Sequence, residues 1–568
     1  MEANKKWWLE HYPTGVPHEV NCQQYTSLVQ MAEEGFAKYA ERDMYTCLDK
    51  TLTFAEVDEL SRAFGAWLQT LGLPKGARVA LMMPNVLQYP VAIIGVLRAG
   101  YVVVNVNPLY TPRELEHQLN DSGAEAIVVL ENFATTLQAV IAKSKIKHVV
   151  LASVGDLLGF PKGLITNFVI RKVKKVVPPF SLPGATHFND AISRGRRAKL
   201  VTPTLGPEDI AFLQYTGGTT GLSKGAVLVH ENIYGNCLIS EAWLHPAMVD
   251  TSKGPPPDPL VLVCALPMYH IFALVTCMWL AIKTGGHNIL ILNPRDLDGT
   301  VKALRKHRFN VLPAVNTLFN GLVNHAGFRT LDFSSMRVSN GGGMAVQRAV
   351  AEKWLNLTKT PIVEGYGLTE TASGATCNPV MSTEYTGDVG MPMPSTEISI
   401  RDDDGNDVAL GERGEICIRG PQVMRGYWQR PDDTAEVMTP DGFLKSGDIG
   451  IMLPNGHVKI VDRKKDMILV SGFNVYPNEI EDVVASCPGV LECAAIGVPD
   501  EKTGETVKLF IVKSDPALTE ETVRAYCREN MTGYKNPKFI VFRDSLPKTP
   551  VGKILRRELR EKEPPLKT

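Results

Sequence analysis

The stretch Tyr215–Gly225, with the sequence YTGGTTGLSKG, combines residue types that bind phosphate. Its glycines permit positive φ, so that backbone N–H groups can converge on an anion, while hydroxyls and Lys224 supply further donors. A Walker loop requires glycine before the lysine and serine or threonine after it, whereas Ser223 and Gly225 flank this lysine in the opposite order. The stretch therefore predicts a phosphate-binding loop other than that of a P-loop kinase. The alternative is an ordinary Gly/Thr-rich surface turn.

Four further motifs carry groups suited to nucleotide chemistry. EGYGLTE (364–370) places an aromatic ring among glycines and a hydroxyl beside a carboxylate, a pair that suits purine stacking and a magnesium ion. DGFLKSGD ends at Asp448, and DRKKD contains Arg463, so that an acid and an arginine could hold ribose hydroxyls. LPKTPVGKILRREL presents Lys553 after a Pro/Gly turn. Each motif alone is a weak signal.

The elements that must position these motifs follow an α/β pattern. Thr53 and Glu56 form a capping-box signature before an amphipathic helix, and the apolar runs RVALMM and YVVVNV flank another helical segment. A further helix is expected near 112–122, followed by the run AIVVL. Strand and helix alternation of this kind predicts doubly wound sheets. We expect residues 209–395 to form a second α/β layer that carries the glycine loop.

The pattern changes after Thr396. TEISIRD, GEICIRG and GHVKIVDR alternate apolar and polar residues between turns, which predicts a small β-rich subdomain. Short strands and helices beginning near Pro477 and Thr519 then predict a small α+β C-terminal domain. We place the boundary in DRKKD, so that the N-terminal domain covers residues 1–463 and the C-terminal domain covers 464–568.

Taken together and in this order, the motifs closely resemble those of the AMP-forming acyl-CoA synthetases, over about 52–559. Within that superfamily, YTGGTTGLSKGA, ALPMYHIFAL, EGYGLTE and SGFNVYPNEIE look most like bacterial long-chain fatty acid CoA ligases. The resemblance implies a large N-terminal AMP-binding domain and a mobile C-terminal lid. It also implies a reaction in two halves: a fatty carboxylate attacks the α-phosphorus of ATP to give acyl adenylate and pyrophosphate, and the thiol of coenzyme A then releases AMP. Magnesium is the implied metal.

The same resemblance assigns the site residues. The phosphates would be held by Thr216, Gly217, Gly218, Thr219, Thr220, Gly221 and Lys224. Glu370, beside Thr369, would serve magnesium and the α-phosphate. The nucleoside would contact Tyr366, which stacks on adenine, Asp448 and Arg463 at the ribose, and Gly342 in the segment NGGG. The acyl carboxylate would meet His270 and Lys553, and the lid would turn about the hinge Lys465.

Each assignment has a structural alternative. His270 could be a core histidine, Lys553 an exposed lysine of a basic tail, and NGGG a mere turn. Other reactions also stay open: transfer of the acyl group to a carrier protein, activation of an aryl acid, or an inactive nucleotide-binding scaffold at a membrane. The preferred chain length depends on pocket side chains that the sequence does not identify.

The composition of the chain limits the kinds of partner and the cellular location that we expect. Sixty basic and 61 acidic residues give a formal net charge of -1, which offers no general attraction to nucleic acid. The ten cysteines lack paired spacing, and the chain lacks an apolar signal core and an 18-residue apolar run, so we expect a cytoplasmic protein. Residues 163–177 interleave apolar and basic side chains, which favours peripheral contact with the inner face of the cytoplasmic membrane or, equally, a solvated insertion. A homodimer is left open.

Overall fold

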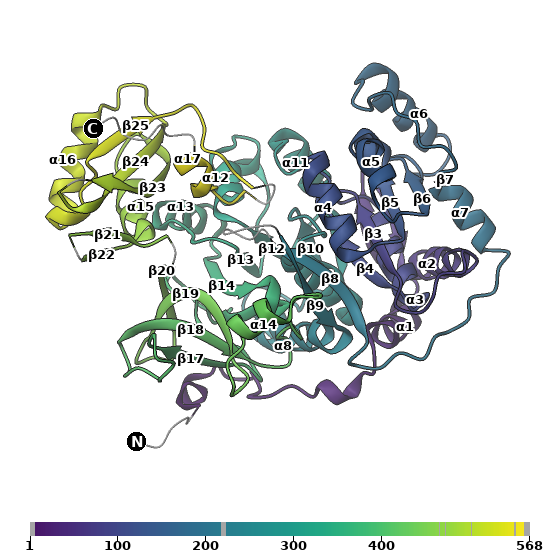
Figure 1. The fold of residues 1–568 in the computed structure, drawn as a ribbon, viewed down its shortest axis with the longest axis horizontal. Coiled ribbons are helices and arrows are strands. Elements are labelled where there is room, and N and C mark those ends of the chain that lie inside the picture. Colours follow the sequence, from purple (N-terminus) through teal and green to yellow (C-terminus); the bar gives the residue numbers. More distant parts are fainter. Residues whose placement is uncertain are drawn as a thin grey trace.

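The computed structural model describes residues 6–216, 223–464, 466–471, 473–500, 502–549 and 552–561. Two large sheets with covering helices fill most of the molecule, and a small sheet and a C-terminal α+β part stand at one end (Figure 1). The predicted α/β class is therefore confirmed. The domain boundary between 463 and 464 stays a prediction.

The first sheet has seven strands in the order β7-β6-β5-β3-β4-β8-β9. Chain order reverses at β3, which defines a doubly wound sheet, and all pairs are parallel except the β8/β9 hairpin. Its strands are β3 (Arg78–Met82), β4 (Val102–Asn105), β5 (Ala126–Leu130), β6 (His148–Ala152), β7 (Thr186–His187), β8 (Ile210–Thr216) and β9 (Lys224–Val229). Its helices are α2 (Phe54–Gln69), α3 (Gln88–Arg98), α4 (Pro112–Ser122), α5 (Ala134–Val140), α6 (Lys162–Phe168) and α7 (Phe188–Gly195).

Local signals explain why two of these helices begin where they do. The Thr53 hydroxyl accepts a hydrogen bond from the N–H of Glu56, whose carboxylate accepts one from the N–H of Thr53, as predicted. Thr111 and Glu114 form a second capping box before Pro112 of α4. Each box satisfies two N–H groups that a helix start leaves unpaired.

The second sheet has nine strands in the order β16-β15-β14-β13-β12-β10-β11-β1-β2. Its strands are β1 (Asp43–Cys47), β2 (Lys50–Thr53), β10 (Val261–Cys264), β11 (His287–Leu290), β12 (Val311–Ala314), β13 (Val338–Gly341), β14 (Ile362–Leu368), β15 (Ser373–Cys377) and β16 (Met391–Pro392). Its helices are α1 (Leu28–Tyr39), α8 (His230–Val249), α9 (Ile271–Ala273), α10 (Leu280–Thr284), α11 (Leu297–Leu304), α12 (Asn316–Asn324) and α13 (Arg348–Thr358). One hydrophobic core runs continuously between the two large sheets.

The glycine loop does not belong to this second layer, so that expectation was wrong. β8 and β9 flank the loop and form the edge of the first sheet, because β9 follows at once and pairs back onto β8 from Thr216↔Lys224 to Ile210↔Val229. The chain crosses to the second sheet only after the long helix α8. Hairpin pairing between sequence neighbours therefore decided the sheet to which the loop belongs.

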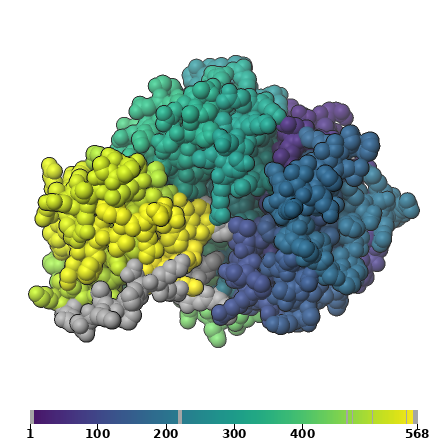
Figure 2. Space-filling model, turned by 90° about the horizontal axis from the view of Figure 1, so that it is seen from above, coloured from purple at the N-terminus to yellow at the C-terminus, as the bar shows by residue number. Residues whose placement is uncertain are grey.

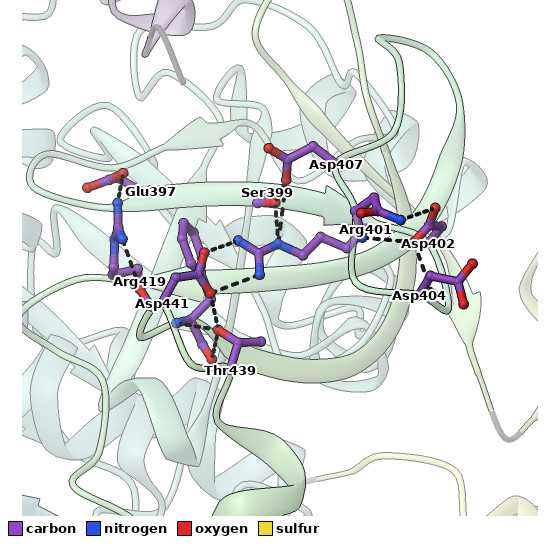
Figure 3. Close-up of polar contacts among 11 residues, drawn as sticks. Glu397, Ser399, Arg401, Asp402, Asp404, Asp407, Arg419, Thr439 and Asp441 are labelled. Atoms are coloured by element: carbon purple, nitrogen blue, oxygen red, sulfur yellow. Dashed lines mark hydrogen bonds and ion pairs between the residues drawn. The ribbon is translucent and has the colours of Figure 1, made fainter. Parts of the chain in front are cut away.

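The small β-rich subdomain is an antiparallel sheet in the order β17-β18-β19-β20. Its elements are β17 (Glu397–Arg401), β18 (Arg413–Arg419), α14 (Pro431–Val437), β19 (Leu444–Met452) and β20 (Val458–Arg463). Figure 3 shows the guanidinium of Arg401 between the Ser399 hydroxyl and the carboxylate of Asp441, to which it donates two hydrogen bonds of 3.0 and 2.6 Å. These contacts tie β17 to the loop before β19, the strand that carries Asp448.

The C-terminal part has its own sheet and its own apolar clusters. Its strands are β21 (Ile468–Val470), β22 (Phe473–Val475), β23 (Val490–Asp500), β24 (Gly504–Lys513) and β25 (Phe539–Phe542), and its helices are α15 (Pro477–Ala485), α16 (Glu520–Asn530) and α17 (Arg556–Glu561). Figure 2 shows this part, in yellow, as a lobe packed against the middle of the chain. Within the described ranges, no helix is both long enough and apolar enough to cross a bilayer.

Candidate active site

A cavity of about 2100 Å³ lies between the large sheets, the small sheet and the C-terminal part. Its volume exceeds the ~300–1,000 Å³ of a typical small-molecule pocket, so it has room for more than one substrate. All predicted site residues whose side chains are described line the cavity. They are Thr216, Lys224, His270, Tyr366, Thr369, Glu370, Asp448 and Lys553, and Gly342 lines it as well. Segments more than 300 residues apart thus meet at one place.

β8 ends at Thr216, which lines this cavity and is the first residue of the predicted phosphate set. Gly217, Gly218, Thr219, Thr220 and Gly221 lie outside the described residues, so only the two ends of the loop are placed. Lys224, at its far end, forms an ion pair of 2.5 Å with Asp433 of α14, and its ammonium lies 5.3 Å from the centre of the Tyr427 ring. Lys224 therefore lies at the C-terminal end of the loop and lines the cavity, where it can bind a phosphate.

Thr369 and Glu370 form a short 3-10 turn at the end of β14. The Tyr427 hydroxyl donates a 2.7 Å hydrogen bond to Glu370 Oε1. Burial, and then the Glu370 charge, raise the pKa of Tyr427 well above its usual value, so this hydroxyl stays a donor. The predicted magnesium carboxylate and the predicted phosphate lysine thus share contacts with one tyrosine.

The carboxylate of Glu370 and the hydroxyl of Thr369 fit the magnesium site predicted from the sequence. Among the described residues no cluster of three or more potential metal ligands exists, so a metal here would depend on few protein groups. Magnesium is commonly bound by one or two carboxylates together with water and substrate phosphates. Glu370 and the neighbouring Thr369 hydroxyl match that pattern.

Tyr366 and Asp448 are joined directly. The Tyr366 hydroxyl donates a 2.7 Å hydrogen bond to Asp448 Oδ2, across 82 residues of sequence. Asp448 on β19 is in register with Arg463 on β20, so the backbone places both predicted ribose residues side by side. Gly342 lies against Phe272, whose ring would come within 2.9 Å of a Cβ added there. A side chain at this position would displace Phe272.

His270 begins the short helix α9 and faces the cavity. Its Nδ1 accepts a 3.3 Å hydrogen bond from the Phe272 N–H. Burial, and then the nearby ammonium of Lys553, lower the pKa of His270 to about 4. The imidazole is therefore neutral near pH 7 and can donate a hydrogen bond through Nε2.

Lys553 reaches the cavity from the C-terminal part. Its loop closes through hydrogen bonds between Thr549 and Lys553, at 2.7 and 3.0 Å. The Thr317 hydroxyl at the start of α12 donates to the Gly552 carbonyl at 3.4 Å. Lys553 and His270, the two residues predicted to meet the acyl carboxylate, thus line the same cavity.

Part of the cavity lining is a set of apolar side chains that the sequence analysis did not identify. They are Trp243 and Leu244 of α8, Leu280 of α10, and Val311, Val338 and Met393. The first part of α8 is buried on all sides, so no apolar stripe in its sequence marks the cavity face. Tyr427 and Asp433 were missed as well; the only signal was the Pro-started helix of RPDDT.

The fold and the site define an AMP-binding enzyme. The family model for the AMP-binding enzyme matches residues 32–428, and the model for the AMP-binding enzyme C-terminal domain matches 479–553. The chain belongs to this family.

Among individual proteins, the chain is 55% identical to the long-chain-fatty-acid–CoA ligase of Escherichia coli O157:H7 over 560 residues, covering 98% of both chains. It is 50% identical to the ligase of the same name from Haemophilus influenzae, covering 98% of this chain and 99% of the relative. ATP-bound MatB from Rhodopseudomonas palustris superposes with a TM-score of 0.80 at 27% identity, over 94% of this chain and 98% of that one.

Proposed function

We propose that this protein is an AMP-forming ligase that activates a medium- to long-chain fatty acid with ATP and transfers the acyl group to coenzyme A. One observation carries the proposal: the predicted phosphate, ribose and carboxylate residues whose side chains are described surround one cavity, which apolar side chains of α8 and α10 also line. The names of the relatives at 50–55% identity agree with it. The homodimer and the cytoplasmic location stay predictions.

In the first half-reaction the carboxylate oxygen forms a bond to the α-phosphorus, and the bond from that phosphorus to the leaving pyrophosphate breaks. Lys224 and the N–H groups of the glycine loop hold the phosphates, while Lys553 holds the incoming carboxylate and an α-phosphate oxygen. Fixed cations and N–H donors in a water-poor cavity stabilise this charge better than water does. Glu370, with the Thr369 hydroxyl beside it, would hold a magnesium ion, which would supply further positive charge against the phosphates.

In the second half-reaction the thiol sulfur of coenzyme A attacks the acyl carbonyl, AMP leaves, and the thiol proton passes to solvent. Neutral His270 orients the acyl carbonyl through Nε2. Asp448, fixed by Tyr366, and Arg463 hold the ribose. The apolar side chains of α8 and α10 bind the alkyl chain, where each buried methylene contributes about 0.8 kcal/mol.

A thioester assay across acids from hexanoate to oleate tests the proposal. We expect one AMP and one acyl-CoA for each acid consumed, with a maximum among medium or long chains. Faster turnover of coumarate would establish an aryl acid as the substrate, as for the feruloyl-CoA synthase of Amycolatopsis, which is 33% identical. Pyrophosphate release without CoA-dependent thioester would favour a carrier protein as acceptor.

We further propose that residues 163–177, here called the basic apolar segment, contact an anionic membrane surface. Its helix α6 exposes Leu164 (65%) and Phe168 (61%), Phe160 (87%) is exposed just before the helix, and Lys172, Lys174 and Lys175 follow it. Figure 1 shows α6 projecting from the body of the molecule. Apolar side chains beside lysines are the combination that binds at the headgroup level of anionic lipid.

Arg171 is exposed but is held by contacts within the protein. Its guanidinium pairs with buried Glu131 at 2.8 Å and donates to the Ser153 hydroxyl at 2.9 Å, so it anchors the segment to the first sheet. The membrane contact is therefore assigned to the three lysines.

A further inference from the structure

Arg556, at the start of α17, is a nearly buried cation with several carboxylate partners. Its guanidinium contacts Glu481 through two hydrogen bonds of 3.1 and 2.8 Å, Asn478 at 2.6 Å and Asp466 at 3.4 Å. Burial alone would lower the pKa of Arg556, but the carboxylates of Glu481, Asp462 and Asp466 more than offset this and raise it. The guanidinium is therefore permanently charged.

These contacts fall on two sides of the predicted hinge. Glu481, Asn478 and Asp466 follow position 465, whereas Asp462, 3.9 Å from Arg556, precedes it on β20. Asp462 is fully buried, and its Oδ2 accepts a 2.9 Å hydrogen bond from the N–H of Asn478 in the first turn of α15. It thus caps a helix of the C-terminal part from the other side of the hinge, where a negative charge is stabilising.

Arg556 is also coupled to Lys553 through a short closed loop. The N–H of Leu555 donates to the Pro547 carbonyl at 2.9 Å, and Lys548 pairs with Ile554. Thr549 closes the tip of this loop on Lys553. Any contact that fixes Arg556 therefore also fixes the loop that presents Lys553 to the cavity.

We propose that Asp462 and Arg556, with the Asn478 N–H, form a latch that holds the lid in the arrangement for adenylation and so positions Lys553. The inference rests on the proposed two-step reaction. Rotation of the lid about position 465 must carry Arg556 and Asn478 away from Asp462. The latch thus favours the first half-reaction and opposes passage to the second. Asp462 and Arg556 are positioning residues, since they act through Lys553.

The test compares both half-reactions in Asp462→Asn, Asp462→Ala and a matched control, Arg560→Gln. Asparagine keeps the shape and a hydrogen-bond acceptor but loses the charge, whereas alanine loses both. Arg560 lies on the same helix and pairs with Asp466 at 3.0 Å, so its loss perturbs the C-terminal part without removing the contacts of Asp462. Fatty-acid-dependent ATP–pyrophosphate exchange measures the first half, and thioester formation from synthetic acyl adenylate measures the second.

We expect the first half-reaction to fall about fivefold in Asp462→Asn and at least about twentyfold in Asp462→Ala, with the second half unchanged or faster in both and Arg560→Gln close to wild type. Equal loss in both halves, no loss in either, or the same split in Arg560→Gln would overturn the latch.

Amide hydrogen exchange gives a readout that is independent of activity. We expect the first turn of α15, in peptides covering 475–485, to exchange faster in Asp462→Ala than in wild type or Arg560→Gln. Unchanged exchange there contradicts the latch. A wild-type protein that forms no acyl adenylate would instead contradict the proposed function, while the exchange comparison still tests the latch.

Discussion

At the scale of single residues, Lys553 is the group on which the two half-reactions should differ most. If its ammonium contacts the reacting oxygens only during adenylation, Lys553→Ala should slow the first half by about a hundredfold or more, equivalent to about 3 kcal/mol of transition-state stabilisation. Thioester formation from supplied acyl adenylate should be nearly normal. Pyrophosphate exchange and thioester assays on one preparation measure both.

One control variant and one contrasting variant complete this test. Lys513→Ala removes a lysine of the C-terminal part outside the lining of the cavity and should leave both halves intact. Lys465→Pro, at the predicted hinge outside the described residues, should form acyl adenylate but transfer it poorly, because proline restricts the φ that lid rotation must change. The same defect in Lys553→Ala and Lys465→Pro would refute an alternating lid.

Glu364 is a buried carboxyl whose titration should be visible in stability. Burial raises its pKa to about 8, although the Val346 N–H, which donates to Oε1 at 2.9 Å, partly counters this. The carboxyl has a pKa near 4.5 in the unfolded chain and about 8 in the folded protein, so between these pH values only the folded state keeps the proton. The unfolding free energy that this group contributes therefore falls as pH rises from 4.5 to 8.

Glu364→Gln should remove that dependence. We expect similar unfolding free energies for variant and wild type at pH 5, and a variant more stable by about 2 kcal/mol or more at pH 8. Urea unfolding at both pH values, with the exposed Glu352→Gln as control, measures the difference. A difference between variant and wild type that does not change with pH would show that Glu364 is ionised in the folded state.

At the scale of elements, the basic apolar segment should carry the membrane contact. The variant with Lys172, Lys174 and Lys175 changed to glutamine should lose most flotation with anionic vesicles at low salt, since each lysine near such a surface contributes about 1 kcal/mol. Phe168→Ser should weaken binding to a smaller extent, because it removes one apolar group and no charge.

The matched control changes three exposed lysines elsewhere, Lys145, Lys199 and Lys353, to glutamine. It lowers the net charge equally, so loss of flotation in this variant as well would indicate general electrostatic attraction. Equal flotation of wild type and the Lys172/Lys174/Lys175 variant would show that the segment is a solvated insertion.

At the scale of the whole molecule, the ten cysteines are all unpaired; nine are buried and Cys22 is half-buried. Burial raises the thiol pKa, to about 11 for Cys22 and about 12 for Cys377, so little reactive thiolate exists near pH 8. We expect at most one thiol to react with a disulfide reagent in the native protein, and ten in guanidinium chloride. Rapid native reaction of several thiols would show that the cores open readily.

The sequence by itself determined the groups that take part in the chemistry and the local elements. Short motifs identified Lys224, Glu370, Asp448 and Lys553, and capping signals placed the start of α2, because such signals act within one turn of a helix. The resemblance of the motif set to AMP-forming synthetases was confirmed by the family match over residues 32–428. The individual roles of these residues stay predictions.

The tertiary structure alone decided which groups meet. Tyr366 with Asp448, Tyr427 with Glu370, and Asp462 with Arg556 are separated by 57 to 94 positions, and no local pattern encodes such pairs. The same holds for the apolar side chains of α8 that line the cavity and for the sheet whose strands β8 and β9 flank the glycine loop. Helix caps and strand periodicity arise from contacts within a few residues, so the sequence reveals them. The long-range pairs form only when the sheets and domains pack. Burial and strand register then decide which of many possible partners each side chain contacts.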